Sequence, residues 1–375
     1  MKLTTKNYVK RILAGVMMMT LAMGSFAGCG KKDAEVTTVA SNINNTQAAS
    51  EGASKSDANA AGHPNEARSK LTGLWVPAET ANNVPVAVMY NNIIDAMPQS
   101  SIGSADIVFE ALAEGGITRI CALFENKPEL TKIGSVRSCR TYFLFLAKEF
   151  EALYLHYGSS MYADEYLKMA KMHSIDGYLS NGGFYRTTDR VAPHNAYSSW
   201  QGVMDSAEKL GYPTTYPAGY RSPLLFTTDD SKDITFAADP IAEKCNKLYL
   251  GYTHNNPWFE YNEDEKVYYR FQFDGPQVDA ETGEQLKFKN ILIKYVTGDY
   301  YDNGTPNYVN SDAGMAMYVT DGYAEPVTWW KLTEYGQTNY YKQDGSELEI
   351  NQGKTFICYV EERFKDGVKV LPTLD

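Results

Sequence analysis

The stretch ADIVFEALAEGGITRICALFEN, residues 105–126, decides the fold of the first half of the chain. Both of its ends are rich in β-branched and aromatic residues, and the Gly115-Gly116 dipeptide between them is typical of a two-residue hairpin turn. Such a turn would place Leu112 opposite Arg119, and alternation along the strands then sorts the side chains onto two faces. One predicted face carries Glu110, Glu114, Arg119 and Cys121.

Strands and helices alternate around this hairpin. Residues 84–90, VPVAVMY, and 152–158, ALYLHYG, have the composition of buried strands. Residues 140–150, 161–172 and 198–211 have the length and pattern of helices, with Ser138 as an expected cap before the first and Gly211 as the stop of the last. This alternation predicts an α/β domain over residues 72–228, with a mixed sheet because of the hairpin.

The remaining part, residues 229–375, has a different composition. Short runs of β-forming residues are separated by turn-forming segments such as DAETGE, DNGTPN and QDGSE. The predicted strands lie within residues 266–273, 289–296, 316–320, 326–332, 338–343 and 354–360. We therefore expect a mostly antiparallel β-rich C-terminal domain.

The N-terminus has the features of a lipoprotein signal. Basic residues precede an apolar run over 12–28, and Phe26-Ala27-Gly28-Cys29 is similar to a lipobox, in which the cysteine receives lipid. Residues 1–29 are thus the expected signal peptide with Cys29 as the lipidation site. Residues 30–71 are polar and lack aromatic residues, which predicts a disordered tether. The expected location is the outer face of the cytoplasmic membrane, with lipid on Cys29 as the anchor.

Composition and missing motifs exclude several classes of protein. The formal net charge of -11 argues against nucleic acid as a partner. The chain has no CxxC, HExxH, GxSxG, P-loop or GxGxxG pattern, so we expect neither a cofactor nor a metal. Cys121, Cys139, Cys245 and Cys358 stand in apolar or helical contexts and are expected to be buried free thiols.

The segment IGSVRSCR, residues 133–140, places Arg137 and Arg140 at the start of a predicted helix. Helix N-termini favour anions, so cations there need compensation. The guanidinium groups could hold an external phosphate or carboxylate, or they could pair with Glu110 and Glu114 inside the protein. Both interpretations stay open. The expected ligand-binding residues are Arg119, Arg137, Arg140, Ser138, Asn91, Asn92, Arg190 and Asn195.

Two histidines are candidates for proton transfer. His156 ends a predicted strand, where α/β sheets tend to bind ligands, and His194 lies in the irregular polar stretch 182–197. Together with two acidic residues of the hairpin they complete the catalytic candidates, which are Glu110, Glu114, His156 and His194. A structural role for each histidine is the competing interpretation.

The hairpin and arginine segments together resemble a known family. The motifs EAL-x-EGGITR and IG-x-VRS-x-R, with the later RVAPHNAY, resemble the YerB-like bacterial lipoproteins, a two-domain family of unknown function. The resemblance implies a lipoprotein with an α/β N-terminal domain and a β-rich C-terminal domain, without an established reaction. Residues that match the motifs are Glu110, Glu114, Gly115, Gly116, Arg119, Gly134, Arg137, Ser138, Arg140 and Pro193-His194-Asn195.

Three functions follow from these residues. The first is a lipoprotein that binds an anionic envelope ligand, such as a cell-wall polymer or a peptidoglycan fragment, through an arginine-rich site. The second is a cell-envelope hydrolase or transferase that uses a Glu/His/Arg site. The third is a structural or assembly lipoprotein without a ligand, whose arginines would all be paired within the protein.

Overall fold

A computed structural model describes residues 57, 59–169, 172–308 and 312–374. The predicted signal peptide, Cys29 and most of the predicted tether lie outside these residues. All described residues belong to one structural unit. Within them, no helix has both the length and the apolar character needed to cross a membrane.

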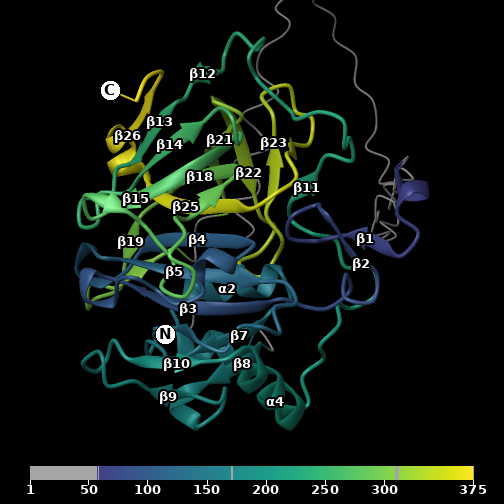
Figure 1. Ribbon diagram of the computed structural model, residues 1–375. Coiled ribbons are helices and arrows are strands. Elements are labelled where there is room, and N and C mark those ends of the chain that lie inside the picture. Colours follow the sequence, from purple (N-terminus) through teal and green to yellow (C-terminus); the bar gives the residue numbers. More distant parts are fainter. Residues whose placement is uncertain (1–56, 58, 170–171, 309–311, 375) are drawn as a thin grey trace, which may run out of the picture. The chain divides into compact units, whose positions relative to one another are not determined.

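One large mixed sheet runs through both predicted domains (Figure 1). Its strands follow the order β12-β22-β21-β18-β25-β4-β5-β3-β7-β8, and β23 pairs with β22. The strands are β12 (Glu243–Lys244), β22 (Tyr323–Trp330), β21 (Ala313–Thr320), β18 (Asn290–Val296), β25 (Thr355–Glu361), β4 (Ile107–Leu112), β5 (Thr118–Phe124), β3 (Val86–Asn92), β7 (Leu153–His156), β8 (His173–Asp176) and β23 (Asn339–Tyr341).

Strand β25 joins the two halves of this sheet. It pairs parallel with β18 on one side and parallel with β4 on the other. Strands β3, β7 and β8 are also parallel neighbours, whereas β4–β5, β5–β3, β18–β21 and β21–β22 are antiparallel. The predicted mixed sheet in the first half and the β-rich second half are therefore confirmed. The predicted boundary after residue 228 stays a prediction, and the sheet continues across it.

A second sheet of six strands covers one face of the large sheet near β25. Its order is β16-β15-β14-β13-β26, with β17 paired to β15. Phe259 of β14 packs edge-on against Phe356 of β25, with ring centroids 5.0 Å apart. The strands are β16 (Gly275–Pro276), β15 (Val267–Gln272), β14 (Trp258–Asn262), β13 (Lys247–Leu250), β26 (Val368–Leu371) and β17 (Lys287–Phe288).

The helices cover both faces of the first half of the large sheet. Helix α2 (Thr141–Glu149) is almost wholly buried, and its Phe143 ring lies 5.4 Å from Phe109 of β4. Helix α4 (Trp200–Leu210) packs on the opposite face, in a core cluster with Leu155. Helix α3 (Ala163–Met169) follows β7. The predicted helices are thus present, and Gly211 ends α4 in a left-handed conformation.

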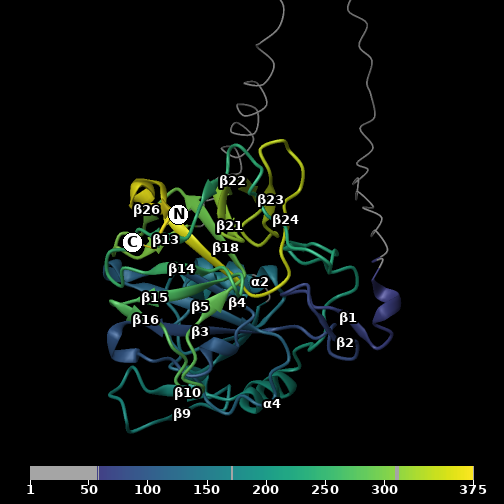
Figure 2. The same ribbon diagram turned by 45° about the horizontal axis from the view of Figure 1, so that its top comes forward.

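Small sheets and 3-10 helices complete the unit (Figures 1 and 2), with β9 and β10 at the same end as α4 in both views. The short strands are β1 (Glu66–Arg68), β2 (Trp75–Pro77), β6 (Ile133–Gly134), β9 (Tyr185–Arg186), β10 (Ala196–Ser198), β11 (Leu225–Phe226), β24 (Glu349–Ile350), β19 (Asp299–Tyr300) and β20 (Pro306–Asn307). The 3-10 helices are η1 (Ala60–Gly62), η2 (Ile94–Ala96), η3 (Ile102–Ser104), η4 (Glu114–Gly116), η5 (Gly177–Leu179) and η6 (Glu362–Gly367).

The end of the predicted tether is folded. Strand β1 pairs antiparallel with β2, and Arg68 forms ion pairs of 2.7 Å with both Asp57 and Asp230. Leu71 is fully buried. Pairing with residues far along the chain therefore overrides the polar composition of this segment, and disorder is the wrong expectation for residues 59–71.

The hairpin between β4 and β5 has a longer turn than predicted. Leu112 pairs with Thr118 and Ala111 pairs with Arg119, so residues 113–117 form the connection. Gly115 and Gly116 both have positive φ angles, 70° and 75°, which glycine adopts without strain. A shift of one residue reverses the face of a side chain, and Glu110 consequently lies on the face opposite Arg119. The predicted Glu110–Arg119 contact is therefore wrong.

Candidate functional site

The segment IGSVRSCR crosses the carboxyl ends of two parallel neighbours, β3 and β7. The Asn91 N–H donates to Ser135 O at 3.0 Å, and the Arg137 N–H donates to Met89 O at 2.8 Å. On the other side, the Tyr157 N–H donates to Arg137 O at 3.0 Å. Carboxyl ends of parallel strands are the usual place for ligands in α/β sheets. The backbone thus holds Arg137 at a position that favours binding.

Four arginines gather here, and we name Arg119, Arg137, Arg140 and Arg186 the arginine cluster. Arg119, from β5, is only 3% exposed, and its Nη1 donates to Ser138 O at 2.9 Å. Burial and the neighbouring Arg140 and Arg137 lower the pKa of Arg119 to about 10. Keeping Arg119 charged therefore costs free energy, and a nearby anion would reduce this cost.

Arg140 already has a carboxylate partner. Its Nε donates to Glu114 Oε1, and its Nη2 donates to Glu114 Oε2 at 2.8 Å. Its Nη1 donates to Cys139 O at 2.8 Å and to Ser138 O at 3.3 Å. Burial raises the pKa of Glu114, but the hydrogen bond and charge of Arg140 outweigh it and lower that pKa to about 2. The guanidinium fork of Arg140 is therefore filled by the protein.

Arg137 differs from Arg140 because no carboxylate of the described residues pairs with it. Its Nη1 donates to Pro193 O at 3.4 Å, and its buried Nε has no hydrogen-bond partner among the described residues. Burial and the charges of Arg140 and Arg186 lower the pKa of Arg137, although Glu114 opposes them. A buried N–H without a partner is costly. This half-buried guanidinium is thus the member of the cluster best suited to an external anion.

Arg186 is a functional candidate that the sequence interpretation did not select. It comes from β9, its guanidinium carbon lies 5.0 Å from the centre of the Tyr157 ring, and its Nη1 donates to Asn195 Oδ1 at 2.8 Å. The irregular polar stretch 182–197 was the available signal, but its arginines could not be ranked by spacing. Pairing of β9 with β10, and of β10 with β6, brings Arg186 to the segment IGSVRSCR.

His194 and Asn91 border the cluster. The Asn91 side-chain amide and His194 Nδ1 are 2.6 Å apart, and Asn91 lies on β3 directly opposite Arg119. Burial and the charge of Arg137 lower the pKa of His194. The imidazole is therefore neutral near pH 7, which suits a hydrogen-bonding role beside an anion more than a charged one.

Glu110 and Asn92 belong to a separate set of polar side chains on the other face of the sheet. Glu110 is fully buried, and its carboxylate accepts hydrogen bonds from Arg270, from Asn92 at 3.0 Å and from Asn255 at 2.8 Å. We name the buried network the set Glu110, Asn92, Gln99, Thr118, Asn255, Arg270, Gln272 and Gln277. It connects β4, β3 and β15 across the predicted domain boundary, so Glu110 and Asn92 are not beside the arginines.

His156 is held by the protein through both ring nitrogens. Nδ1 lies 2.9 Å from Gly158 O and Nε2 lies 2.8 Å from Ser174 Oγ, and the side chain is fully buried. Burial lowers its pKa, while Asp176 at 3.8 Å opposes that shift. These contacts favour a structural role for His156, because neither ring nitrogen is left for a substrate.

Three further expected residues take supporting positions. Arg190 donates to Ala96 O and Pro98 O, both at 2.7 Å, and so fastens its loop to the segment after β3. Asn195 accepts from Arg186 and donates to Thr187 O at 2.8 Å. The Ser138 hydroxyl donates to Tyr157 O at 2.9 Å and does not cap α2, whose N-cap is Arg140 without a side-chain cap. The expected Ser138 cap is therefore wrong.

No cluster suited to a metal ion occurs in the described parts of the chain, which hold no group of three or more His, Cys, Asp or Glu side chains so arranged. Cys121, Cys139, Cys245 and Cys358 are all buried free thiols, as expected. Burial raises the pKa of Cys139 to about 12, which removes thiolate character from the only cysteine within the segment IGSVRSCR.

Comparisons with known proteins place the sequence in a family. The family "Protein of unknown function (DUF3048) N-terminal domain" matches residues 71–213, and the corresponding C-terminal domain matches residues 248–357. A Bacillus subtilis (strain 168) protein named "Putative lipoprotein YerB" is 33% identical over 301 residues, which cover 79% of this chain and 86% of that protein. The chain belongs to the YerB-like DUF3048 family.

A solved YerB-like structure has the same fold. The crystal structure of YerB from Bacillus subtilis aligns with a TM-score of 0.71 and 28% sequence identity, covering 81% of this chain and 99% of that one. The resemblance expected from the hairpin and arginine motifs is thereby confirmed. Both DUF3048 segments contribute strands to the one large sheet described above.

Proposed function

We propose that this protein is an extracytoplasmic, membrane-anchored lipoprotein whose arginine cluster binds an anionic group of the cell envelope. The observation that carries the proposal is Arg137, a half-buried guanidinium with an unpartnered buried Nε and cationic neighbours. Within the described residues, the carboxylate that pairs with one of these four arginines, Glu114, is already bound to Arg140. The local charge is therefore positive in a chain of net charge -11.

The chemistry of the site favours phosphate or carboxylate oxygens. A guanidinium presents a planar fork of donors that matches such oxygens, and a charge-assisted bond would satisfy the free Nε of Arg137. The neighbouring Asn91 and neutral His194 can hydrogen-bond the remaining oxygens. We take a phosphate-bearing cell-wall polymer as the first candidate and a peptidoglycan carboxylate as the second.

The anchor supports an envelope location. Cys29 follows an apolar segment in a lipobox-like context, and the Bacillus subtilis relative is named as a lipoprotein. Lipid on Cys29 would hold the protein on the outer face of the cytoplasmic membrane, within reach of wall polymers. Palmitate labelling of the wild-type protein and of Cys29→Ser tests this part, and equal labelling of both would contradict it.

The binding proposal is tested by calorimetric titration of the purified full chain with inorganic phosphate and with a short polyol-phosphate oligomer. Arg137→Gln should weaken oligomer binding at least tenfold, because it removes the guanidinium group that has no carboxylate bound to it. Arg363→Gln, which removes the same charge from an exposed site, is the matched control and should leave binding unchanged. Absence of binding to the wild type, or equal affinity for Arg137→Gln, would refute the proposal.

The hydrolase or transferase alternative has less support. A Glu/His pair for proton transfer needs a free carboxylate beside the histidine, but Glu114 is bound to Arg140 and Glu110 lies in the buried network. His156 has no free ring nitrogen, and His194 has no carboxylate hydrogen-bonded to it among the described residues, although the charge of Asp95 acts on its pKa. The ligand-free structural alternative predicts that all arginines are paired, and Arg137 does not fit it.

A further inference from the structure

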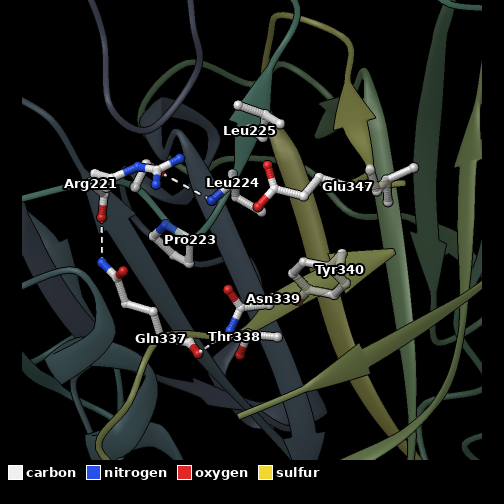
Figure 3. Close-up of a pocket in the computed structure, with 11 residues that line it drawn as sticks. Arg221, Pro223, Leu224, Leu225, Gln337, Thr338, Asn339, Tyr340 and Glu347 are labelled. Atoms are coloured by element: carbon white, nitrogen blue, oxygen red, sulfur yellow. Dashed lines mark hydrogen bonds between the residues drawn. The ribbon is translucent and has the colours of Figure 1, made fainter. Parts of the chain in front are cut away.

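A cavity in the second half of the unit shares no residue with the arginine cluster. It has a volume of about 300 Å³ and lies between the chain segment 221–225 and the residues around β23 (Figure 3). This volume is at the lower end of the range for small-molecule sites. The exposed side chains of Arg221 and Glu347 place its mouth at the surface.

Two opposite charges face this cavity without pairing. Figure 3 shows the Arg221 guanidinium and the Glu347 carboxylate pointing toward one another from opposite sides. Neither side chain has a hydrogen-bond or ion-pair partner within the described ranges of the chain. Arg221 is held through its backbone, because its carbonyl accepts from the Gln337 side chain. A ligand with an anionic and a cationic end would satisfy both charges at once.

The wall between the two charges carries amide and apolar groups. Asn339 and Gln337 line the cavity, and the Asn339 amide donates to Gln337 O at 3.2 Å. The buried Leu224 and Tyr340 supply apolar surface. Amides can hydrogen-bond a peptide group, while the apolar surface can cover short side chains. The position of Arg221 is fixed further by β11, which pairs with β24 close by.

We propose that this cavity binds a short peptide with free termini, whose carboxylate contacts Arg221 and whose ammonium group contacts Glu347. Such a ligand would bridge the chain segment 221–225 and the turn that joins β23 to β24. The proposal does not depend on the arginine cluster, because no lining residue is shared.

The test is calorimetric titration of the full chain with alanylalanine, its N-acetyl derivative and its C-terminal amide. The wild type should bind the free dipeptide at least tenfold more tightly than either derivative. Glu347→Gln should lose this preference over the N-acetyl derivative, whereas Arg221→Gln should lose the preference over the amide. Glu349→Gln is the matched control, because this exposed carboxylate is not part of the cavity lining.

The variants change exposed side chains, so the unfolding midpoint should stay at the wild-type value and confirm that each variant is folded. Absence of saturable dipeptide binding by the wild type would overturn the proposal. Equal binding of the free and blocked dipeptides would also overturn it, as would the same loss in Glu349→Gln as in Glu347→Gln. None of these results would affect phosphate binding at Arg137, so the two proposals fail separately.

Discussion

The buried network and the arginine cluster both take residues from the stretch EALAEGGITR, but Arg270 of the network and Arg137 of the cluster differ in carboxylate pairing and in exposure. Glu110 and Arg270 are both fully buried and bonded to each other, with amides on the remaining carboxylate oxygen. Arg119, on the other face of the sheet, and Arg137 donate to backbone carbonyls and have no carboxylate hydrogen bond among the described residues. Arg137 and Arg270 each have a buried Nε without a hydrogen-bond partner among the described residues. Arg270 is enclosed and paired with a carboxylate, which makes it part of the fold, whereas Arg137 is partly exposed and is therefore open to a ligand.

Strand alternation produces this division. Glu110 and Arg119 lie on adjacent strands but one position out of register, so their side chains leave the sheet on opposite faces. One face meets β15 and its Arg270, and the other meets the segment IGSVRSCR. Charged residues of one motif thus stabilise the fold on one face of the sheet and, in our account, contribute to binding on the other.

The largest effect is expected from breaking the buried network. Glu110→Ala leaves the Arg270 charge buried without a carboxylate, which should lower the free energy of unfolding by about 3–5 kcal/mol. Urea unfolding measures the change. The double variant Glu110→Leu with Arg270→Met is the control and should lose less than the single variant. A loss below about 1 kcal/mol for Glu110→Ala would contradict the structural role of the network.

Lys294 provides a second buried basic side chain for the comparison. Its Nζ donates to Thr338 Oγ1 at 3.1 Å and lies 4.0 Å from the centre of the Trp329 ring, and no carboxylate in the described part of the chain pairs with it directly. Burial lowers its pKa to about 7 from 10.5 in the unfolded chain. The unfolded state therefore binds more protons between these values, and the stability contribution of Lys294 rises with pH across this range.

Substitution of Lys294 removes this pH dependence. The stability of the wild type relative to Lys294→Met should rise between pH 7 and 9 by up to about 1.4 kcal/mol per pH unit. Urea unfolding of both proteins at pH 7, 8 and 9 measures the difference. Exposed Lys232→Met is the control and should show no such trend. A constant difference between wild type and Lys294→Met would show that the amine is not buried in its neutral form.

A smaller effect is expected from Glu114, the carboxylate that pairs with Arg140 of the arginine cluster. Glu114→Gln frees the guanidinium of Arg140, so the affinity for phosphate should rise a few-fold. The free energy of unfolding should fall by about 1 kcal/mol or less, because the carboxylate is partly exposed. Calorimetric titration and urea unfolding measure the two changes. The exposed Glu263→Gln is the control. A fall in phosphate affinity would mean that the Glu114–Arg140 pair itself builds the site.

The same pair gives a pH dependence of defined sign. Because the pKa of Glu114 is about 2 in the fold and 4.5 without it, its contribution to stability is present above pH 4.5 and is lost as the pH falls toward 2. Unfolding midpoints of wild type and Glu114→Gln should therefore converge as the pH is lowered from 5 to 3. Midpoints that stay equally far apart over this range would contradict the ion pair.

The strands and helices could be predicted because their apolar periodicity and flanking glycines are local signals. The predicted run 140–150 became α2 at Thr141–Glu149, and the run 354–360 became β25 at Thr355–Glu361. The hairpin register could not be predicted, since a Gly-Gly pair fits a two-residue turn as well as the observed connection over 113–117.

Contacts between side chains far apart in the sequence could not be predicted from local signals either. Nothing near Glu110 in the sequence points to Arg270 as its partner, because the contact arises only when β15 packs over the large sheet. The sequence placed Arg119, Arg137 and Arg140 together among the expected ligand-binding residues, and their role in binding stays a prediction, while the structure shows that the three side chains lie close enough for their charges to interact. Arg186 could be assigned to the arginine cluster only from the pairing of β9 with β10, which no local signal predicts.

Anomalous diffraction from crystals of the full chain soaked in selenate, an analogue of phosphate and sulfate, tests the central claim most directly. Our account predicts a selenium peak within hydrogen-bonding distance of the Arg137 guanidinium, its loss in Arg137→Gln, and no peak beside Arg270. A peak that persists in Arg137→Gln, or no peak at the arginine cluster in the wild type, would contradict the account.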